Sequence, residues 1–237
     1  MPAPEVFEAE YIHWPWGKVL AAAVNWVEAT VPKSGFVVDY MCGTGFLLSE
    51  IAKRRRDITA LGCDIHAPYV KYGQDRYASI ELVEDDALVF HPPAPPDLII
   101  CTAGIHHLAR DDQPRFISKV SRELAEDGLF LVGEEVISSY ADEEGRRGAI
   151  LEMFRTLMAH IGRTRPRHEV VQAAADVMVN DWCERGEYKT SKSGLEELLT
   201  VNFNILSARH IWPEDCAGFG DWLLACRKRP ISMQTAM

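Results

Sequence analysis

Apolar residues in this chain alternate between short continuous runs and stripes at helical spacing, and this alternation predicts the fold. Short apolar runs that end at polar or glycine residues predict buried parallel strands, at residues 36–39, 58–63, 80–83, 97–102 and 129–133. Stripes with helical spacing predict helices around and between them, at residues 17–29, from 46 onward, 67–77 and 113–124. Strands that alternate with helices are typical of an α/β protein with a parallel sheet.

The segments outside this alternation predict an arm, a cap and a hairpin. Residues 5–16 are rich in aromatic side chains and predict a short helix or an irregular arm. Residues 142–182 carry two helical stripes, and a short helix at 193–200 precedes an antiparallel hairpin at 203–212 and 219–227. We therefore expect an arm and helix at 1–34, a main domain at 35–139 and 191–229, and a helical cap at 140–190. Residues 230–237 are expected to be a frayed tail.

The stretch FVVDYMCGTGFLLSEI, residues 36–51, is the most informative of the chain. It reads as a strand that ends in a carboxylate, a glycine-bearing turn and the start of a helix, which is the opening of a nucleotide-binding α/β domain. Glycine lets a ligand lie against the backbone and allows a positive φ. The third glycine of a dinucleotide fingerprint is replaced by Leu48, and no Gly-Lys-Ser/Thr follows. From this turn alone, an ordinary βα turn of another α/β protein stays open.

The details of the turn resemble motif I of the class I S-adenosylmethionine-dependent methyltransferases. Asp39 lies four positions before Gly43, Gly-Thr-Gly follows, and Met41 stands where the family has its first glycine. The strand from Asp97 and the His-His-Leu after it resemble motif IV of the small-molecule, natural-product type. The resemblance implies a Rossmann-like, seven-stranded sheet with an antiparallel last strand, and the second helical region then becomes a cap inserted after the fifth strand.

The resemblance also implies a cofactor, S-adenosyl-L-methionine, at the carboxyl ends of the strands. Asp64 follows the second strand and is expected to bind the ribose, while Asp86 and Ala87 follow the third strand and are expected to meet the adenine. Met41 is expected to point its side chain away, so that binding survives. The full set of expected cofactor residues is Tyr11, Asp39, Met41, Cys42, Gly43, Gly45, Asp64, Ile65, Asp86, Ala87 and Thr102.

The acceptor site is expected at the ends of the fourth and fifth strands. His106 and His107 follow the fourth strand and Glu134 follows the fifth. Histidine titrates near neutrality and can take a proton from a hydroxyl, while a carboxylate can hold the imidazole in the useful tautomer. An alternative is that one histidine, His107 rather than His106, is a structural residue of the loop. The cap is expected to add an apolar roof, from Phe154, Met158 and Met178.

The composition of the chain limits the classes of partner that the protein is expected to bind. The net charge of −10 argues against a nucleic-acid-binding protein, and no apolar stretch is long enough to cross a membrane. The six cysteines are dispersed, no Cys/His spacing predicts zinc, and no metal is expected. We expect a cytoplasmic enzyme with a small-molecule substrate, and a homodimer is left open.

Three functions are consistent with the sequence. The first is methyl transfer to a small molecule, at a hydroxyl or another nucleophilic atom, by direct in-line displacement. The second is a methyltransferase-fold enzyme that binds the cofactor but catalyses a reaction other than methylation. The third is a catalytically silent binding protein, which the methionine at position 41 keeps open.

Overall fold

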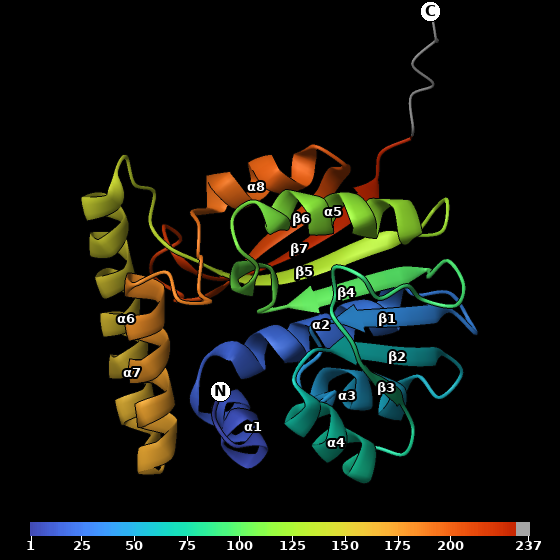
Figure 1. Ribbon diagram of the computed structural model, residues 1–237, viewed down its shortest axis with the longest axis horizontal. Helices are drawn as coiled ribbons and strands as arrows, with labels where there is room; N and C mark the ends of the chain where they lie inside the picture. The colour runs from blue at the N-terminus through green and yellow to red at the C-terminus, as the bar shows by residue number, and fades with distance from the viewer. Residues whose placement is uncertain (231–237) are drawn as a thin grey trace, which may run out of the picture.

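A computed structural model describes residues 1–230 of the chain; most of the expected tail, residues 231–237, lies outside the described residues. Seven strands form one sheet in the order β3-β2-β1-β4-β5-β7-β6 (Figure 1). Strands β1 to β5 are parallel, and β7 runs antiparallel to both of its neighbours. This is the predicted methyltransferase sheet. Its strands are β1 (Phe36–Tyr40), β2 (Thr59–Asp64), β3 (Glu81–Glu84), β4 (Leu98–Thr102), β5 (Leu129–Val136), β6 (Phe203–Trp212) and β7 (Gly220–Lys228).

Helices cover both faces of the sheet, which explains why the central strands are apolar without alternation. Val37 of β1 packs with helices α2, α3 and α4 on one face, and its neighbour Val38 packs with α5 and α8 on the other (Figure 1). These helices are α2 (Trp16–Thr30), α3 (Phe46–Arg54), α4 (Ala67–Arg76), α5 (Asp112–Glu123) and α8 (Lys192–Thr200).

Strand β5 is longer than the sequence pattern predicts. The prediction ended it at Gly133, but the strand continues to Val136, so Glu134 and Glu135 lie within it and pair with β7. Two glutamates interrupt the apolar pattern from which a buried strand is recognised. Both are nevertheless buried or nearly so, because the chain returns over them after the cap.

Helices α6 (Glu143–Thr164) and α7 (His168–Trp182) form the predicted insertion after the fifth strand. They pack on each other, and α7 also contacts α1 (Pro4–His13), the helix formed by the N-terminal arm. Residues 183–191, here named the strap, then return to the sheet. The Ile137 amide donates to the Thr190 carbonyl at 3.0 Å, and the Tyr188 amide donates to the His106 carbonyl at 2.7 Å. The strap therefore lies against the ends of both β4 and β5.

Candidate functional site

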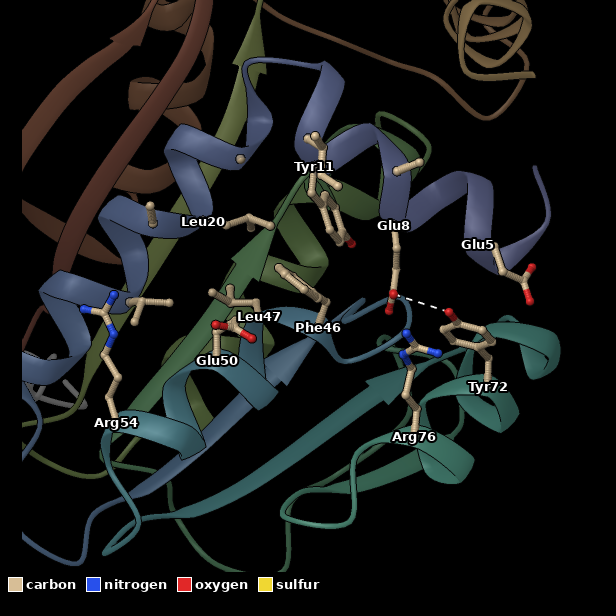
Figure 2. Close-up of a pocket in the computed structure, with 15 residues that line it drawn as sticks. Glu5, Glu8, Tyr11, Leu20, Phe46, Leu47, Glu50, Arg54, Tyr72 and Arg76 are labelled. Atoms are coloured by element: carbon tan, nitrogen blue, oxygen red, sulfur yellow. Dashed lines mark hydrogen bonds between the residues drawn. The ribbon is translucent and has the colours of Figure 1, made fainter. Parts of the chain in front are cut away.

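Two cavities of similar size lie on the two sides of helix α1. One, of about 560 Å³, is lined by α1, α2, α3 and α4, and Figure 2 shows Leu47 and Phe46 at its floor. The other, of about 550 Å³, lies at the carboxyl ends of the strands and is named the sheet-edge cavity. Tyr11 lines both. Ligands of open α/β sheets bind outside the carboxyl ends of the strands, which favours the sheet-edge cavity as the functional one.

Most of the residues expected from the sequence line the sheet-edge cavity. From the expected cofactor set they are Tyr11, Met41, Cys42, Gly43, Asp64, Ile65, Asp86, Ala87 and Thr102, and His106 and His107 join them. Asp39, Gly45 and Glu134 are not among its lining residues. The cap contributes Ala173 and Val177 to the lining in place of the expected Phe154, Met158 and Met178. The periodic stripe predicts which helical faces are buried, but not which buried side chains reach a cavity.

The turn after β1 is built on left-handed backbone conformations. Gly43 has a φ of 58° and Gly45 a φ of 76°. A Cβ on Gly43 would lie 2.7 Å from the ring of Phe7, because helix α1 closes directly over the turn. A Cβ on Gly45 would meet Leu82, so this glycine allows helix α3 to pack on the sheet and does not face the ligand space. Glycine is required at Gly43 both by the backbone conformation and by the close approach of α1.

Met41 has a φ of 57°, a strained value for a residue with a side chain. Its side chain lies against the loop after β4, as the contact with Gly104 shows: a Cβ on Gly104 would lie 3.0 Å from the Met41 Cε.

We predict that Met41→Gly changes the dissociation constant of S-adenosylhomocysteine by less than about threefold, since glycine accepts this φ without strain. Calorimetric titration of the two proteins checks this. A tenfold or greater loss would show that the methionine side chain itself holds the cofactor.

Asp64 ties the ends of two strands together. Its Oδ2 accepts from the Gly43 amide at 2.7 Å and its Oδ1 accepts from the His66 amide at 2.8 Å. Burial raises the pKa of this carboxyl, although the two backbone donors oppose the shift. Each carboxylate oxygen can accept a further hydrogen bond, so Asp64 can hold the turn and still receive two hydroxyl groups.

Asp39 lies in β1 with an exposed fraction of 1%, and neither carboxylate oxygen has a hydrogen-bond partner within residues 1–230. Burial raises the pKa of this carboxyl well above its usual value, and the neighbouring Asp64 raises it further. An unpaired buried carboxyl is costly unless a ligand supplies a donor or a positive charge. The position of this group beside the glycine turn therefore indicates a ligand with a cationic or donor group.

Glu134 orients the imidazole of His106. The Glu134 Oε1 accepts from the amides of Gly104 at 3.1 Å and Ile105 at 2.7 Å, and its Oε2 lies 2.5 Å from the His106 Nδ1. Because this carboxylate already serves as an acceptor, we assign the proton of the pair to Nδ1, which leaves the Nε2 lone pair free. Burial lowers the pKa of His106 well below its usual value, and the positive charge of Lys189 lowers it further. The imidazole is therefore neutral at neutral pH.

His107 lies beside His106 but is exposed, and its Nδ1 lies 3.1 Å from the Gly186 carbonyl of the strap. The strap was not expected to reach this site. Its Glu187 lies 3.4 Å from the His106 Nε2 and 3.4 Å from the His107 Nδ1. Burial opposes ionisation of Glu187, but the positive charge of Lys189 brings its pKa down to about 2. A contact between residues about eighty positions apart leaves no periodic signal in one sequence.

One group of three potential metal ligands occurs within residues 1–230. It consists of His106, His107 and Glu187, whose ligand atoms lie within 4.8 Å of one another. Two imidazoles and a carboxylate suit divalent transition metals. The Lys189 ammonium, however, lies 2.8 Å from Glu187. A metal ion at this position would share the carboxylate with a buried lysine, which makes the group better suited to proton transfer and hydrogen bonding.

Glu10 of helix α1 also lines the cavity and was not expected from the sequence. Its exposed fraction is 8%, and burial together with the negative charges of Glu135 and Glu187 raises its pKa to about 8. This pKa lies above the ordinary value of 4.5, so the contribution of Glu10 to stability is complete below about pH 4.5 and is lost as the pH rises towards about 8.

We predict that Glu10→Gln stabilises the protein without ligand, and more so at about pH 8.5 than at about pH 5. The expected increase at the higher pH is about 1 kcal/mol or more, or about 2–4 °C in the melting temperature. Melting curves of both proteins at the two values test this. Glu5→Gln is the control, because Glu5 lies on the same helix but is exposed. An equal shift at both pH values would contradict the assigned pKa.

Residues 37–128 match the family described as "Methyltransferase domain". The match covers less than half of the chain, and with the sheet order and the glycine turn it identifies these residues as a methyltransferase domain. The chain contains a class I S-adenosylmethionine-dependent methyltransferase domain. None of the curated proteins matches the methyltransferase chain in sequence.

Solved structures show the same fold. A TehB-like S-adenosylmethionine-dependent methyltransferase from Corynebacterium glutamicum has a TM-score of 0.57 at 16% identity, over 89% of this chain and 93% of its own. The N-methyltransferase NodS from Bradyrhizobium japonicum, in complex with S-adenosylhomocysteine, has a TM-score of 0.58 at 13% identity, over 88% and 85%. The cyclopropane synthase MmaA2 from Mycobacterium tuberculosis has a TM-score of 0.64 at 11% identity, over 89% and 83%. At these identities the likeness establishes the methyltransferase fold and not the acceptor.

Proposed function

We propose that this methyltransferase transfers the methyl group of S-adenosylmethionine to a nucleophilic atom of a small molecule, with His106 as the general base. The observation that carries the proposal is the sheet-edge cavity, which brings the glycine turn, Asp64 and Asp86 together with the buried His106. The cofactor side and the proton acceptor thus face one cavity, as direct transfer requires.

The residues of the cavity fit the cofactor. Gly43 lines the cavity and its amide is held by Asp64, and the unpaired Asp39 beside this turn suits the ammonium group of the methionine part. Asp64 has free lone pairs for the ribose hydroxyls, and the loop at Asp86 follows β3 in the place expected for the adenine. When it is bound, the cofactor supplies an activated methyl group on a sulfonium.

The protein then has three tasks: to position the nucleophile, to exclude water and to take up a proton. Helix α1, the cap and the strap line the acceptor end of the cavity. The free Nε2 of His106 can accept the proton of a hydroxyl or of another protonated nucleophile, and the imidazolium formed is stabilised by Glu134 and Glu187. Glu134 acts through His106 and is a positioning residue.

A small acceptor is supported by the size and composition of the site. The cavity of about 550 Å³ must hold both the cofactor and the acceptor, which leaves room for a small acceptor only. The net charge of −10 does not favour a nucleic acid substrate. Among the structural neighbours are an N-methyltransferase and the mitomycin 7-O-methyltransferase MmcR, and they support a small molecule as the acceptor class.

A reducing compartment such as the cytoplasm is the proposed location, because all six cysteines are free thiols. The helices described over residues 1–230 include none that is both long and apolar enough to span a membrane.

The proposal is tested by incubating the protein with S-adenosylmethionine that carries a deuterated methyl group and with pools of small metabolites. Mass spectrometry should find S-adenosylhomocysteine together with a product that has gained the labelled methyl group. Cofactor consumption without a labelled acceptor would instead favour a non-methylating enzyme of this fold. Cofactor binding without any consumption across the pools would favour a silent binding protein.

A further inference from the structure

The acceptor end of the sheet-edge cavity is acidic and aromatic. The carboxyl groups of Glu10, Glu135 and Glu187 line it from helix α1, strand β5 and the strap, and no lysine or arginine is among the lining residues over residues 1–230. Trp14 and Trp16, with exposed fractions of 9% and 6%, also line it. Carboxylates and aromatic faces together are the groups that bind organic cations in proteins.

Glu10 is the member of this set without a partner. The basic group that contacts the others is Lys189, whose Nζ lies 2.8 Å from Glu187 and 3.5 Å from Glu135. No hydrogen bond or ion pair to the Glu10 side chain occurs within the described part of the chain, residues 1–230, although the residue is more than nine-tenths buried. A carboxyl group in this situation lacks a donor or a cation that a ligand in the cavity can supply.

An unpaired donor beside it is an independent sign of a polar ligand. The indole Nε1 of Trp14 is buried and has no acceptor within residues 1–230. Its ring lines the same cavity, one helical turn along the chain from Glu10. Buried indole N–H groups ordinarily have a partner. Glu10 and Trp14 therefore both indicate that a polar molecule completes this wall.

The charged neighbours of Glu10 differ from those of the carboxyl proposed for the cofactor. The charges that raise the pKa of Glu10 are those of Glu135 and Glu187, and Glu187 contacts both His106 and His107. Asp39, the unpaired carboxyl proposed for the cofactor, is influenced instead by Asp64 at the glycine turn. The two unpaired carboxyl groups thus have different charged neighbours.

On the basis of the proposed function, we infer that the acceptor is a cationic small molecule, a primary or secondary amine with an apolar body. Its ammonium group binds Glu10, with the faces of Trp14 and Trp16 beside it, and its apolar body lies against Ala173 and Val177 of the cap. An ammonium in this place replaces the missing partner of Glu10 and favours its ionised form, which burial and the acidic neighbours otherwise disfavour. Acceptors whose only charge is a carboxylate or a phosphate are excluded, because they offer Glu10 no cation.

The test uses three probes of similar shape: phenethylamine, 2-phenylethanol and 3-phenylpropanoate. Each is titrated calorimetrically into the full-length protein saturated with S-adenosylhomocysteine. The amine should bind about tenfold or more tightly than the alcohol, since a hydrogen bond to a charged group is lost with the ammonium. The carboxylate probe should bind more weakly than the alcohol. An amine that binds no better than the alcohol, or a carboxylate that binds best, overturns the inference.

Two variants assign the preference to its residue. Glu10→Gln should reduce the affinity for the amine by about tenfold, with the affinities for the alcohol and for S-adenosylhomocysteine unchanged. Glu5→Gln, the exposed control on the same helix, should leave all three as in the wild type. If Glu10→Gln instead weakens S-adenosylhomocysteine and spares the amine, Glu10 is a cofactor residue and the inference is wrong. The probe ranking in the wild type decides the matter even if Glu10→Gln does not fold.

These outcomes are separable from a failure of the proposed function. If S-adenosylhomocysteine does not bind the wild-type protein, the cofactor assignment itself fails and no amine preference follows. If it binds and the labelled methyl group reaches only acceptors without a basic nitrogen, methyl transfer stands and the amine inference is overturned. Tight binding of Zn²⁺ that abolishes amine binding would assign Glu10, Glu135 and Glu187 to a metal site and would also overturn the amine inference.

Discussion

Replacement of His106 by alanine is expected to lower the rate of methyl transfer by about 10²-fold or more, because it removes the general base. Cofactor affinity should be nearly unchanged, since the side chain lies at the acceptor end of the cavity. The measurement is kcat with a known acceptor, together with a calorimetric titration of S-adenosylhomocysteine. A variant that turns over like the wild type would show that alignment alone is sufficient for catalysis.

Glu134→Gln separates the base from the residue that positions it. A glutamine can still accept from the Gly104 and Ile105 amides, but its amide group then donates to the His106 Nδ1 and moves the imidazole proton to Nε2. The base is blocked although its side chain remains, so kcat should fall as in His106→Ala.

Burial raises the pKa of Glu134 to about 7, so kcat of the wild type should also decline as the pH falls below about 7. If Glu134 had a purely structural role, kcat of the wild type would not follow the titration of this carboxyl.

Replacement of Asp64 by alanine is expected to weaken the binding of S-adenosylhomocysteine by about ten- to a hundredfold, since hydrogen bonds to a charged group are worth about 1.5–3 kcal/mol. The loss has two sources in the structure: the ribose contacts, and the Gly43 amide that Asp64 holds in the turn. Asp64→Asn retains one carbonyl acceptor and should show an intermediate loss.

Asp75→Ala is the matched control for Asp64. Asp75 is exposed on helix α4, where its carboxylate pairs with Lys71. Exposed ion pairs contribute little, so this variant should bind the cofactor like the wild type. Melting temperatures of all three variants show whether the turn still folds. Unchanged affinity in a folded Asp64→Ala protein would remove Asp64 from the cofactor site.

Local patterns in the sequence were sufficient to predict most of the strands and helices of the main domain, while the seven-stranded sheet was implied by the resemblance to the family. The continuous apolar runs of β1 and β4 indicate strands buried on both faces, and helices α3 and α5 follow from their stripes. The glycine turn was also accessible, because Gly43 and Gly45 hold backbone conformations that few other residues accept. Each of these features is fixed by residues that are close together in the sequence.

The acceptor side depends on contacts between distant segments, and the sequence indicated it only in part. His106 and Glu134 were recognised from their positions at strand ends, yet Glu134 lies inside β5, because pairing with β7 extends the strand. Glu10, Glu187 and Lys189 were missed altogether. Glu10 reads as one acid among several in a polar arm, and its burial depends on the packing of α1 against α7. Lys189 reads as a surface lysine, although its side chain is fully buried among acids.

A crystal structure of the protein with S-adenosylhomocysteine tests the central claim most directly, because two cavities of about 560 and 550 Å³ compete for the ligand. We expect the cofactor product in the sheet-edge cavity, with its ribose on Asp64, its adenine beside Ala87 and its sulfur directed towards the space in front of His106. Binding in the other cavity, between helices α1 and α3, or a sheet-edge cavity without ligand at saturating concentration, would contradict the account.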